Sequence, residues 1–137
     1  MEIKKDDVVI SVIITAHNRR KFLKEAITSA LNQEFDRSKH EVIVVKNFED
    51  QEIDSFIEEK NVKSLYTEEE KSGGVQKVGA EESKGSIVCL LDDDDKFHEE
   101  KLRNVCHSFT RYKDLTFYHN NRVVIYDEGK VLLTPEV

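Results

Sequence analysis

The stretch "VVISVIIT" (residues 8–15) decides the fold of this chain, because it is a nearly continuous run of β-branched residues. Such a run is typical of a strand that is buried on both faces, as strands of parallel sheets are. The stretches "EVIVV" (41–45) and "SIVCLLD" (86–92) have the same character, and "VKSLYT" (62–67) predicts a shorter strand. These four stretches predict a central sheet.

Amphipathic segments alternate with the predicted strands. In the first of them, apolar residues recur at helical spacing: Phe22, Leu23, Ala26, Ile27, Ala30 and Leu31. The four predicted helices span residues 18–33, 49–60, 71–85 and 98–112. The third is expected to open with glycines and to stop at Gly85 in a C-cap position.

This alternation predicts a single α/β domain over residues 1–137, with a Rossmann-like, mostly parallel sheet and helices on both faces. The remaining stretch, residues 115–133, reads as β structure. Within it, "DEG" (127–129) predicts the turn of a C-terminal β-hairpin.

Composition narrows the functional class. The 137 residues are 38% hydrophobic and 36% charged, which is typical of a globular domain with its own core. The net charge of −7 disfavours nucleic-acid binding. No apolar run approaches the roughly 20 residues that span a bilayer, and the N-terminus lacks the apolar core of a signal peptide. We therefore expect a cytoplasmic protein without a transmembrane segment.

Polar residues cluster where the predicted strands stop. The strand ends are "TAHN" (15–18), "KNFED" (46–50), "TEEEKSGG" (67–74) and "DDDDKF" (92–97). In open α/β sheets, ligands bind in the crevice beyond the carboxyl ends of the strands. The sequence therefore predicts a ligand site at this edge of the sheet.

Four consecutive aspartates, Asp92 to Asp95, are the strongest signal at that edge. Two carboxylates about 4 Å apart repel by roughly 4 kcal/mol at an effective dielectric near 20, so a cation would relieve the crowding. Mg²⁺ and Mn²⁺ bind carboxylates together with substrate phosphate oxygens. The alternative is that Asp93 and Asp95 point to water and one aspartate caps the following helix. The position at a strand end favours a metal site.

Several segments in order resemble the nucleotide-sugar-binding half of the family 2 glycosyltransferases, which have the GT-A fold. "ISVIITAHNRRKFLKEAITSALNQ" (10–33) is similar to the family's opening strand, loop and helix, which ends in a Ser-x-x-x-Gln pattern. "EVIVVKNFED" (41–50) is similar to its second strand. "GGVQKVGAEESKGSIVCLLDDDD" (73–95) resembles its Gly-rich loop, third helix and acidic DxD element. No P-loop motif and no GxGxxG after the first strand compete with this interpretation.

The resemblance implies an inverting transfer of sugar from a nucleoside diphosphate sugar to an acceptor hydroxyl, with Mg²⁺ or Mn²⁺ assisting the departing diphosphate. It implies that Asp94 is the best metal ligand and that Asp95 either ligates the metal or supports the ligands. Asp92 would contact the ribose or sugar. The residues expected to bind the donor are Thr15, Ala16, His17, Lys46, Asn47, Gly74, Lys77, Asp92 and Asp93.

Some positions depart from the family pattern. Lys46 and Asn47 replace the acidic pair after the second strand; Asn47 can still hydrogen-bond a base edge, whereas Lys46 either meets phosphate or is solvated. Gln76 and Lys77 replace an Arg-Asn pair. His17 replaces a tyrosine, and either stacks on the base or is an exposed turn residue.

The catalytic base is unassigned, since His98 and His119 are candidates by residue type alone. Family members usually continue well past residue 137, through the region that supplies the acceptor site. Two hypotheses therefore stand: a metal-dependent glycosyltransferase, or a non-catalytic nucleotide- and metal-binding module of the same fold. In either case, a second copy of the chain or another partner could supply the acceptor site.

Overall fold

The computed structural model describes residues 7–125 and 131–133 of the chain. Its main strands are β1 (Ile10–Ala16), β2 (His40–Lys46), β3 (Lys63–Tyr66) and β4 (Ile87–Asp92). Its α-helices are α1 (Leu23–Leu31), α2 (Gln51–Glu59), α3 (Ser72–Glu81) and α4 (Lys101–Arg111), and a short 3₁₀ turn, η1 (Arg37–Lys39), precedes β2. The predicted α/β class is confirmed.

The four main strands form one parallel sheet in the order β3-β2-β1-β4. The order reverses at β1, because the chain moves outward from β1 to β2 and β3 and then returns to place β4 on the other side. Thr15 lies opposite Val45 on one side and Asp92 on the other. The carboxyl ends of β1 and β4 therefore meet at the point where α/β sheets commonly bind ligands.

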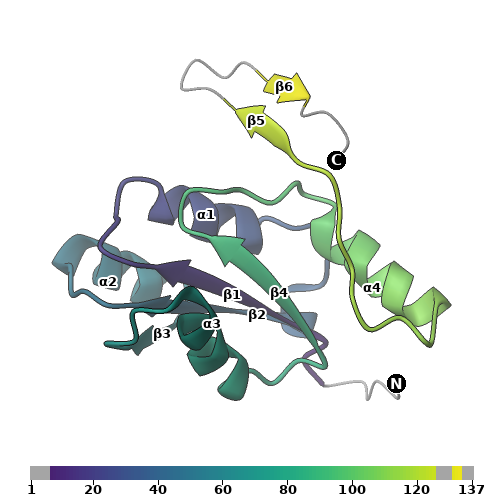
Figure 1. The fold of residues 1–137 in the computed structure, drawn as a ribbon, viewed down its shortest axis with the longest axis horizontal. Helices are drawn as coiled ribbons and strands as arrows, with labels where there is room; N and C mark the ends of the chain where they lie inside the picture. The colour runs from purple at the N-terminus through teal and green to yellow at the C-terminus, as the bar shows by residue number, and fades with distance from the viewer. Residues whose placement is uncertain (1–6, 126–130, 134–137) are drawn as a thin grey trace.

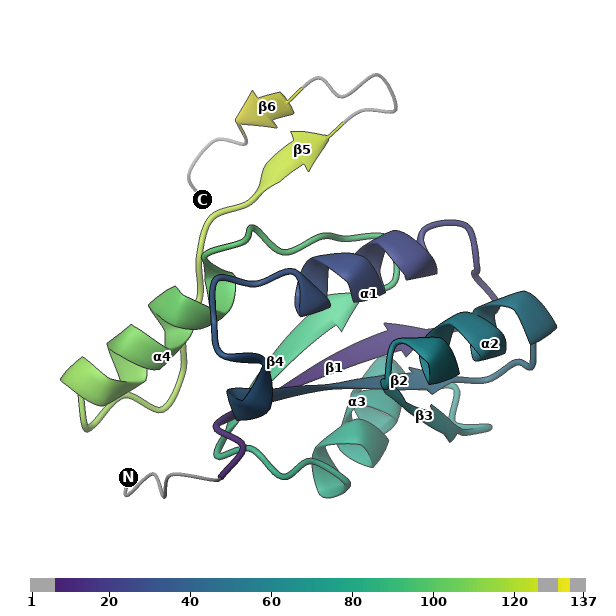
Figure 2. The ribbon, with the colours of Figure 1, turned by 180° about the vertical axis from the view of Figure 1, so that it is seen from behind.

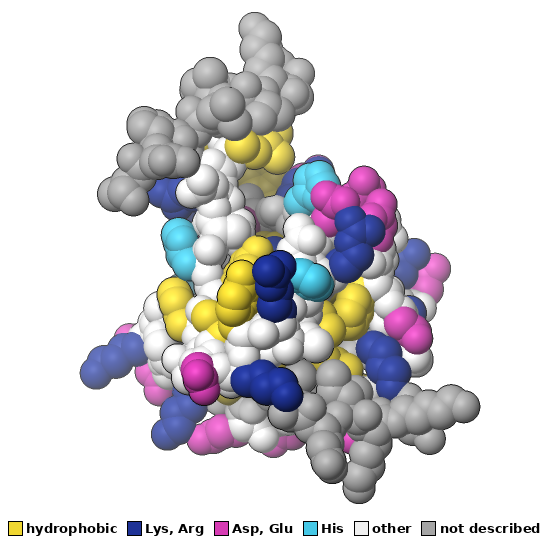
Figure 3. Space-filling model, turned by 90° about the vertical axis from the view of Figure 1, so that its right-hand side faces the viewer, with side chains coloured by type: hydrophobic (Ala, Val, Ile, Leu, Met, Phe, Trp, Pro, Cys, Tyr) yellow, Lys and Arg dark blue, Asp and Glu magenta, His cyan; other side chains and the backbone are white. Residues whose placement is uncertain are grey.

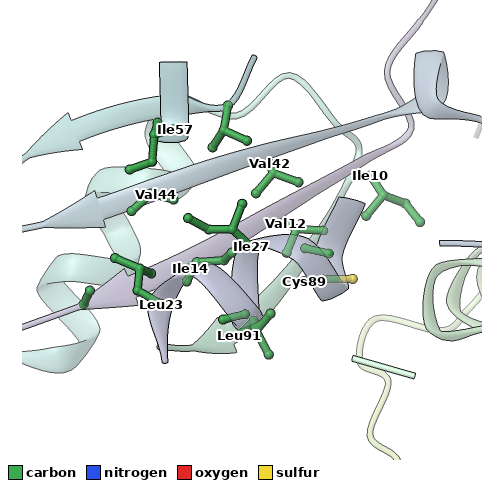
Figure 4. Close-up of a cluster of buried hydrophobic side chains, with 14 of the residues drawn as sticks. Ile10, Val12, Ile14, Leu23, Ile27, Val42, Val44, Ile57, Cys89 and Leu91 are labelled. Carbon is green, nitrogen blue, oxygen red and sulfur yellow. The ribbon is translucent and has the colours of Figure 1, made fainter. Parts of the chain in front are cut away.

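Helices cover both faces of the sheet, but unequally (Figures 1 and 2). α1, α2 and α4 pack on one face, where Ile14, Leu23 and Ile27 point toward one another in the main core (Figure 4). α3 alone packs on the other face, where its Val75 joins a smaller cluster with Ile13 and Ile43. Both faces of β1 are thus buried, as its sequence predicts.

β4 and the end of α3 differ from the prediction. Burial alternates along β4, with Leu90 50% exposed, because β4 is an edge strand and α3 packs on β1 and β2. α3 ends at Glu81, so Gly85 is not its C-cap. Gly85 instead lies against β1: a Cβ on it would come within 2.7 Å of the Ser11 backbone nitrogen, and its N–H donates to Ser11 Oγ at 2.8 Å.

Beyond α4 the chain runs without regular structure to β5 (Val123–Ile125), which pairs antiparallel with β6 (Val131–Leu133) in a separate two-stranded sheet. The predicted turn at residues 127–129 lies outside the described residues, so the hairpin stays a prediction.

On the side that carries α4, hydrophobic side chains show at the surface among charged ones (Figure 3). Within residues 7–125 and 131–133, none of the helices combines the length and apolarity required to cross a membrane.

Candidate functional site

The four aspartates form a tight turn at the carboxyl end of β4. The strand ends at Asp92, and the backbone N–H of Asp95 donates to the Asp92 carbonyl at 3.2 Å. Asp92, Asp94 and Asp95 are exposed, and each offers a carboxylate oxygen within 4.8 Å of the others. Asp93 points inward and is only 3% exposed. The turn therefore presents three carboxylates to solvent and buries the fourth.

Burial and the nearby negative charges disfavour the ionised form of one carboxylate of this turn. Burial raises the pKa of Asp95 above its ordinary value, and the neighbouring Asp94 and Asp92 raise it further, while Arg122 opposes them. A raised carboxyl pKa means that the surroundings of Asp95 disfavour its charged carboxylate form. A divalent cation would reverse that preference, and three carboxylate oxygens are a suitable donor set for Mg²⁺ or Mn²⁺.

The loop after β1 brings a cation to the same turn. Arg19 donates from Nη2 to Asp93 Oδ1 at 2.6 Å and from Nη1 to Asp94 Oδ2 at 3.4 Å. The hydrogen bond to Asp93 and the charges of Asp93 and Asp94 raise the pKa of Arg19. Sequence reasoning missed this residue. Its only signal was a basic residue directly after "TAHN", the segment already assigned to the site.

The loops after β1 and β2 are joined by two asparagines. Asn18 has a left-handed backbone (φ 57°), and its N–H donates to Asn47 Oδ1 at 2.8 Å. In return Asn47 Nδ2 donates to Asn18 Oδ1 at 3.1 Å. Thr15 and Ala16 lead into this loop from β1, and His17 is exposed beside it. The structure thus brings these sequence-predicted residues together at one edge of the sheet.

Lys46 is a correction to the sequence interpretation, which expected it to meet phosphate or to be solvated. Its side chain is 4% exposed, and its Nζ lies 2.6 Å from the Phe48 carbonyl and 2.8 Å from Asp54 Oδ1. The reason is that β2 runs one residue further than predicted and carries Lys46 inside. Its amino group is used within the fold, between β2 and α2.

The two donor-binding candidates on α3, Gly74 and Lys77, each lie next to a glutamate side chain. A Cβ at Gly74 would come within 2.5 Å of the Glu69 side chain, so the loop before α3 closes over this glycine. Lys77 is 75% exposed and pairs with Glu81 at 3.7 Å. Gly74 lies in the first turn of α3, whereas Lys77 lies further along the helix.

The serine and glutamine of the Ser-x-x-x-Gln pattern hold the segment after the turn formed by Asp92 to Asp95, called the acidic turn below. Ser29 Oγ accepts the Phe97 N–H at 3.0 Å. Gln33 donates to the His98 carbonyl at 2.9 Å and accepts the Leu102 N–H at 3.0 Å. α1 and the residues directly after it therefore fix both the exit of the acidic turn and the start of α4. Neither His98 nor His119, both exposed, gains a geometry that marks it as a base.

A family model and several curated relatives match this chain. A family model described as "Glycosyl transferase family 2" matches residues 11–132. An uncharacterized glycosyltransferase of Rickettsia bellii is 29% identical over 130 residues, which cover 92% of this chain and 18% of the relative. Poly(ribitol-phosphate) β-N-acetylglucosaminyltransferase TarS of Staphylococcus aureus is 26% identical over 100 residues, 69% of this chain and 18% of TarS. The chain spans about a fifth of the length of these curated relatives.

Solved structures show the same fold. The structure of S. aureus TarS 1–349 in complex with UDP superposes with a TM-score of 0.69 at 26% identity, covering 77% of this chain and 33% of that one. A mannosyltransferase from Pyrobaculum calidifontis, in complex with GDP-Man and Mn²⁺, has a TM-score of 0.62 at 19% identity, with 73% and 32% covered. The second likeness shows the fold alone. The four-stranded parallel sheet with its helices matches the GT-A fold of TarS.

Proposed function

Because the chain belongs to glycosyl transferase family 2, we propose that it binds a nucleoside diphosphate sugar at the carboxyl edge of its sheet, as the donor-binding part of a metal-dependent, inverting glycosyltransferase. The observation that carries this proposal is the acidic turn. Three exposed carboxylates gather at the end of β4, directly across from Thr15 of β1, at the position where the strand order reverses.

The residues of this edge have separate roles in the proposal. The segment from Thr15 to His17, together with Asn47, lines the base and ribose pocket. Asn18 holds the Asn47 amide in place, which leaves the remaining hydrogen-bonding capacity of that amide for a base edge. Lys46 is not part of this pocket, since its ammonium is buried against Asp54.

The acidic turn is the proposed place for the donor's diphosphate and its cation. Asp94 and Asp95 would hold Mg²⁺ or Mn²⁺, and Asp92 lies near enough to share in the binding or to contact the ribose. When bound, the ion supplies Lewis-acid stabilisation of the departing diphosphate. The chain's own contribution is to fix the carboxylates: the turn hydrogen bond at Asp95 and the Ser29 contact to Phe97 restrain both sides of the turn.

Uridine nucleotides are the first donors to test, because a solved relative at 26% identity carries UDP. We expect the melting temperature of the chain to rise with UDP plus Mn²⁺ and to rise much less with either alone. GDP- and dTDP-sugars in the same thermal-shift series would identify the base. Absence of metal-dependent stabilisation by every nucleotide would exclude the proposed donor site.

The same preparation separates the two hypotheses about activity. Release of UDP from a UDP-sugar, in the presence of Mn²⁺, supports a glycosyltransferase that retains its chemistry in this chain. Tight, metal-dependent nucleotide binding without release would support a non-catalytic module that acts with a partner. An Asp94→Asn variant serves as the negative control for both measurements.

A further inference from the structure

Arg19 contacts the acidic turn through both terminal nitrogens of its guanidinium group, one at a short and one at a long distance. Its Nη2 lies 2.6 Å from Asp93 Oδ1, whereas its Nη1 lies 3.4 Å from Asp94 Oδ2. Asp93 is buried, while the Arg19 side chain is 60% exposed. The guanidinium is therefore anchored on a buried carboxylate, and it extends toward one of the three exposed carboxylates.

Arg19 is held over the acidic turn by the loop after β1, whereas the turn itself follows β4. Arg19 follows Asn18, whose left-handed backbone is fixed by the paired hydrogen bonds to Asn47. Arg19 is separated from Asp93 by 74 positions in the chain, so the contact forms only when β1 and β4 lie side by side. The next residue, Arg20, points elsewhere: it pairs with Asp50 at 3.0 Å and lies 4.3 Å from the ring centroid of Phe48.

We propose that Arg19 is a resident cation of the acidic turn: a positioning residue that holds Asp93 and Asp94 when no metal is bound, and that opposes the binding of a free divalent ion. This inference rests on the proposed function. A guanidinium beside Asp94 repels an incoming dication, but it attracts a diphosphate. The turn should therefore accept the ion more readily together with the donor diphosphate than alone.

Binding of free Mn²⁺, without nucleotide, tests the proposal by calorimetry on the full chain. Arg19→Gln keeps a donor for Asp93 but removes the charge. We expect it to bind free Mn²⁺ at least about tenfold more tightly than the unmodified chain, because a unit charge near the ion is lost at a partly screened site. Arg19→Lys keeps the charge and should bind Mn²⁺ as the unmodified chain does. Arg20→Gln removes an equal charge one residue away and should also leave the affinity unchanged.

Stability in EDTA gives a second readout that does not depend on activity. Without metal, Arg19→Gln should melt at a lower temperature than the unmodified chain, and saturating Mn²⁺ should remove most of that difference. Unchanged or weaker Mn²⁺ binding by Arg19→Gln would overturn this inference, even where UDP with Mn²⁺ still binds. Failure of the unmodified chain to bind Mn²⁺ with or without UDP would overturn the donor site and this inference together.

Discussion

Each aspartate of the turn has its own surroundings, and the surroundings determine what it can do. Asp93 is buried on Arg19, so its carboxylate is already neutralised within the protein. Asp92, Asp94 and Asp95 remain exposed and close together. Four residues of one type thus divide into one that organises the turn and three that are available to a cation.

Substituting the two central aspartates should separate these roles. Asp94→Asn removes a charged oxygen of the proposed metal site, so we expect metal-dependent UDP binding to weaken at least about tenfold. Asp93→Asn removes no exposed ligand and should weaken it less than Asp94→Asn does. Calorimetry with UDP and Mn²⁺ measures both, and circular dichroism checks that each variant is folded. Equal losses in the two variants would contradict this division.

Lys46 contributes to stability through a buried contact. Lys46→Ala would leave the Phe48 carbonyl and the half-exposed Asp54 carboxylate without their partner. We expect the free energy of unfolding to fall by about 2 kcal/mol, below the range for a fully buried pair, because the Asp54 side chain as a whole is 40% exposed although its Oδ1 is buried. Lys63→Ala, which breaks the exposed pair with Glu82, should cost less than about 1 kcal/mol. Urea unfolding compares them, and similar losses would refute the argument.

At the scale of elements, α3 approaches the sheet through a glycine. A Cβ on Gly79 would come within 2.6 Å of Ile13 Cγ2 and 3.1 Å of Val45 Cγ2, whereas a Cβ on Gly73 meets nothing within 4 Å. Both glycines lie in the same helix. They therefore offer a matched pair for testing how closely the helix packs.

Gly79→Ala should lower the free energy of unfolding by about 1–3 kcal/mol, because Ile13 is fully buried and has little room to move. Gly73→Ala should be neutral or stabilise by up to about 1 kcal/mol, since alanine is the better helix former. Urea denaturation of both variants gives the comparison. A Gly79→Ala protein as stable as Gly73→Ala would show that α3 packs less closely than the structure indicates.

The elements themselves were predictable because their signals are local. β1 and β2 are buried on both faces, and uninterrupted β-branched runs report that directly. The edge position of β4 was not predictable, because its sequence is equally apolar and its half-exposure depends on where α3 lies. Gly85 misled for a similar reason: glycine fits a C-cap, but here it permits close contact with β1.

Less of the site was predictable, because it depends on contacts between strands. The acidic turn was found from its place at a strand end, and the structure confirms that place. The Arg19–Asp93 pair joins two loops far apart in sequence, and nothing local indicates it. Lys46 shows the converse: a lysine at a predicted strand end proved to be buried, because β2 continues through it.

At the scale of the whole molecule, ionisable groups lie at both the carboxyl ends and the amino ends of the sheet strands. The acidic turn begins at Asp92, the last residue of β4, whereas His40 begins β2 at the amino ends of the strands. His40 is 2% exposed, and its Nδ1 lies 3.2 Å from the Asp36 carbonyl. Its Nε2 is buried without a hydrogen-bond partner within the described structure. Burial therefore disfavours the charged imidazolium at this place.

Burial lowers the pKa of His40 below its ordinary value, which makes the fold sensitive to mild acid. Between the depressed folded pKa and the unfolded value near 6.5, the unfolded chain binds more protons than the folded one, so stability falls as pH falls. For one such group the slope is at most about 1.4 kcal/mol per pH unit. The raised pKa of Asp95 acts in the opposite sense, because protonation there relieves repulsion in the folded protein.

Replacing His40 isolates its contribution to this acid sensitivity. We expect urea midpoints measured in EDTA to decline between pH 7 and pH 5 in the unmodified chain, and to decline less steeply in His40→Gln, whose side chain carries no titratable group. His107→Gln removes an exposed histidine from α4 and should leave the pH dependence as it is. Because His40 lies at the amino ends of the strands, opposite the acidic turn, metal-dependent UDP binding at pH 7 should be the same in His40→Gln and the unmodified chain. An unchanged slope in His40→Gln would show that another group governs the acid response.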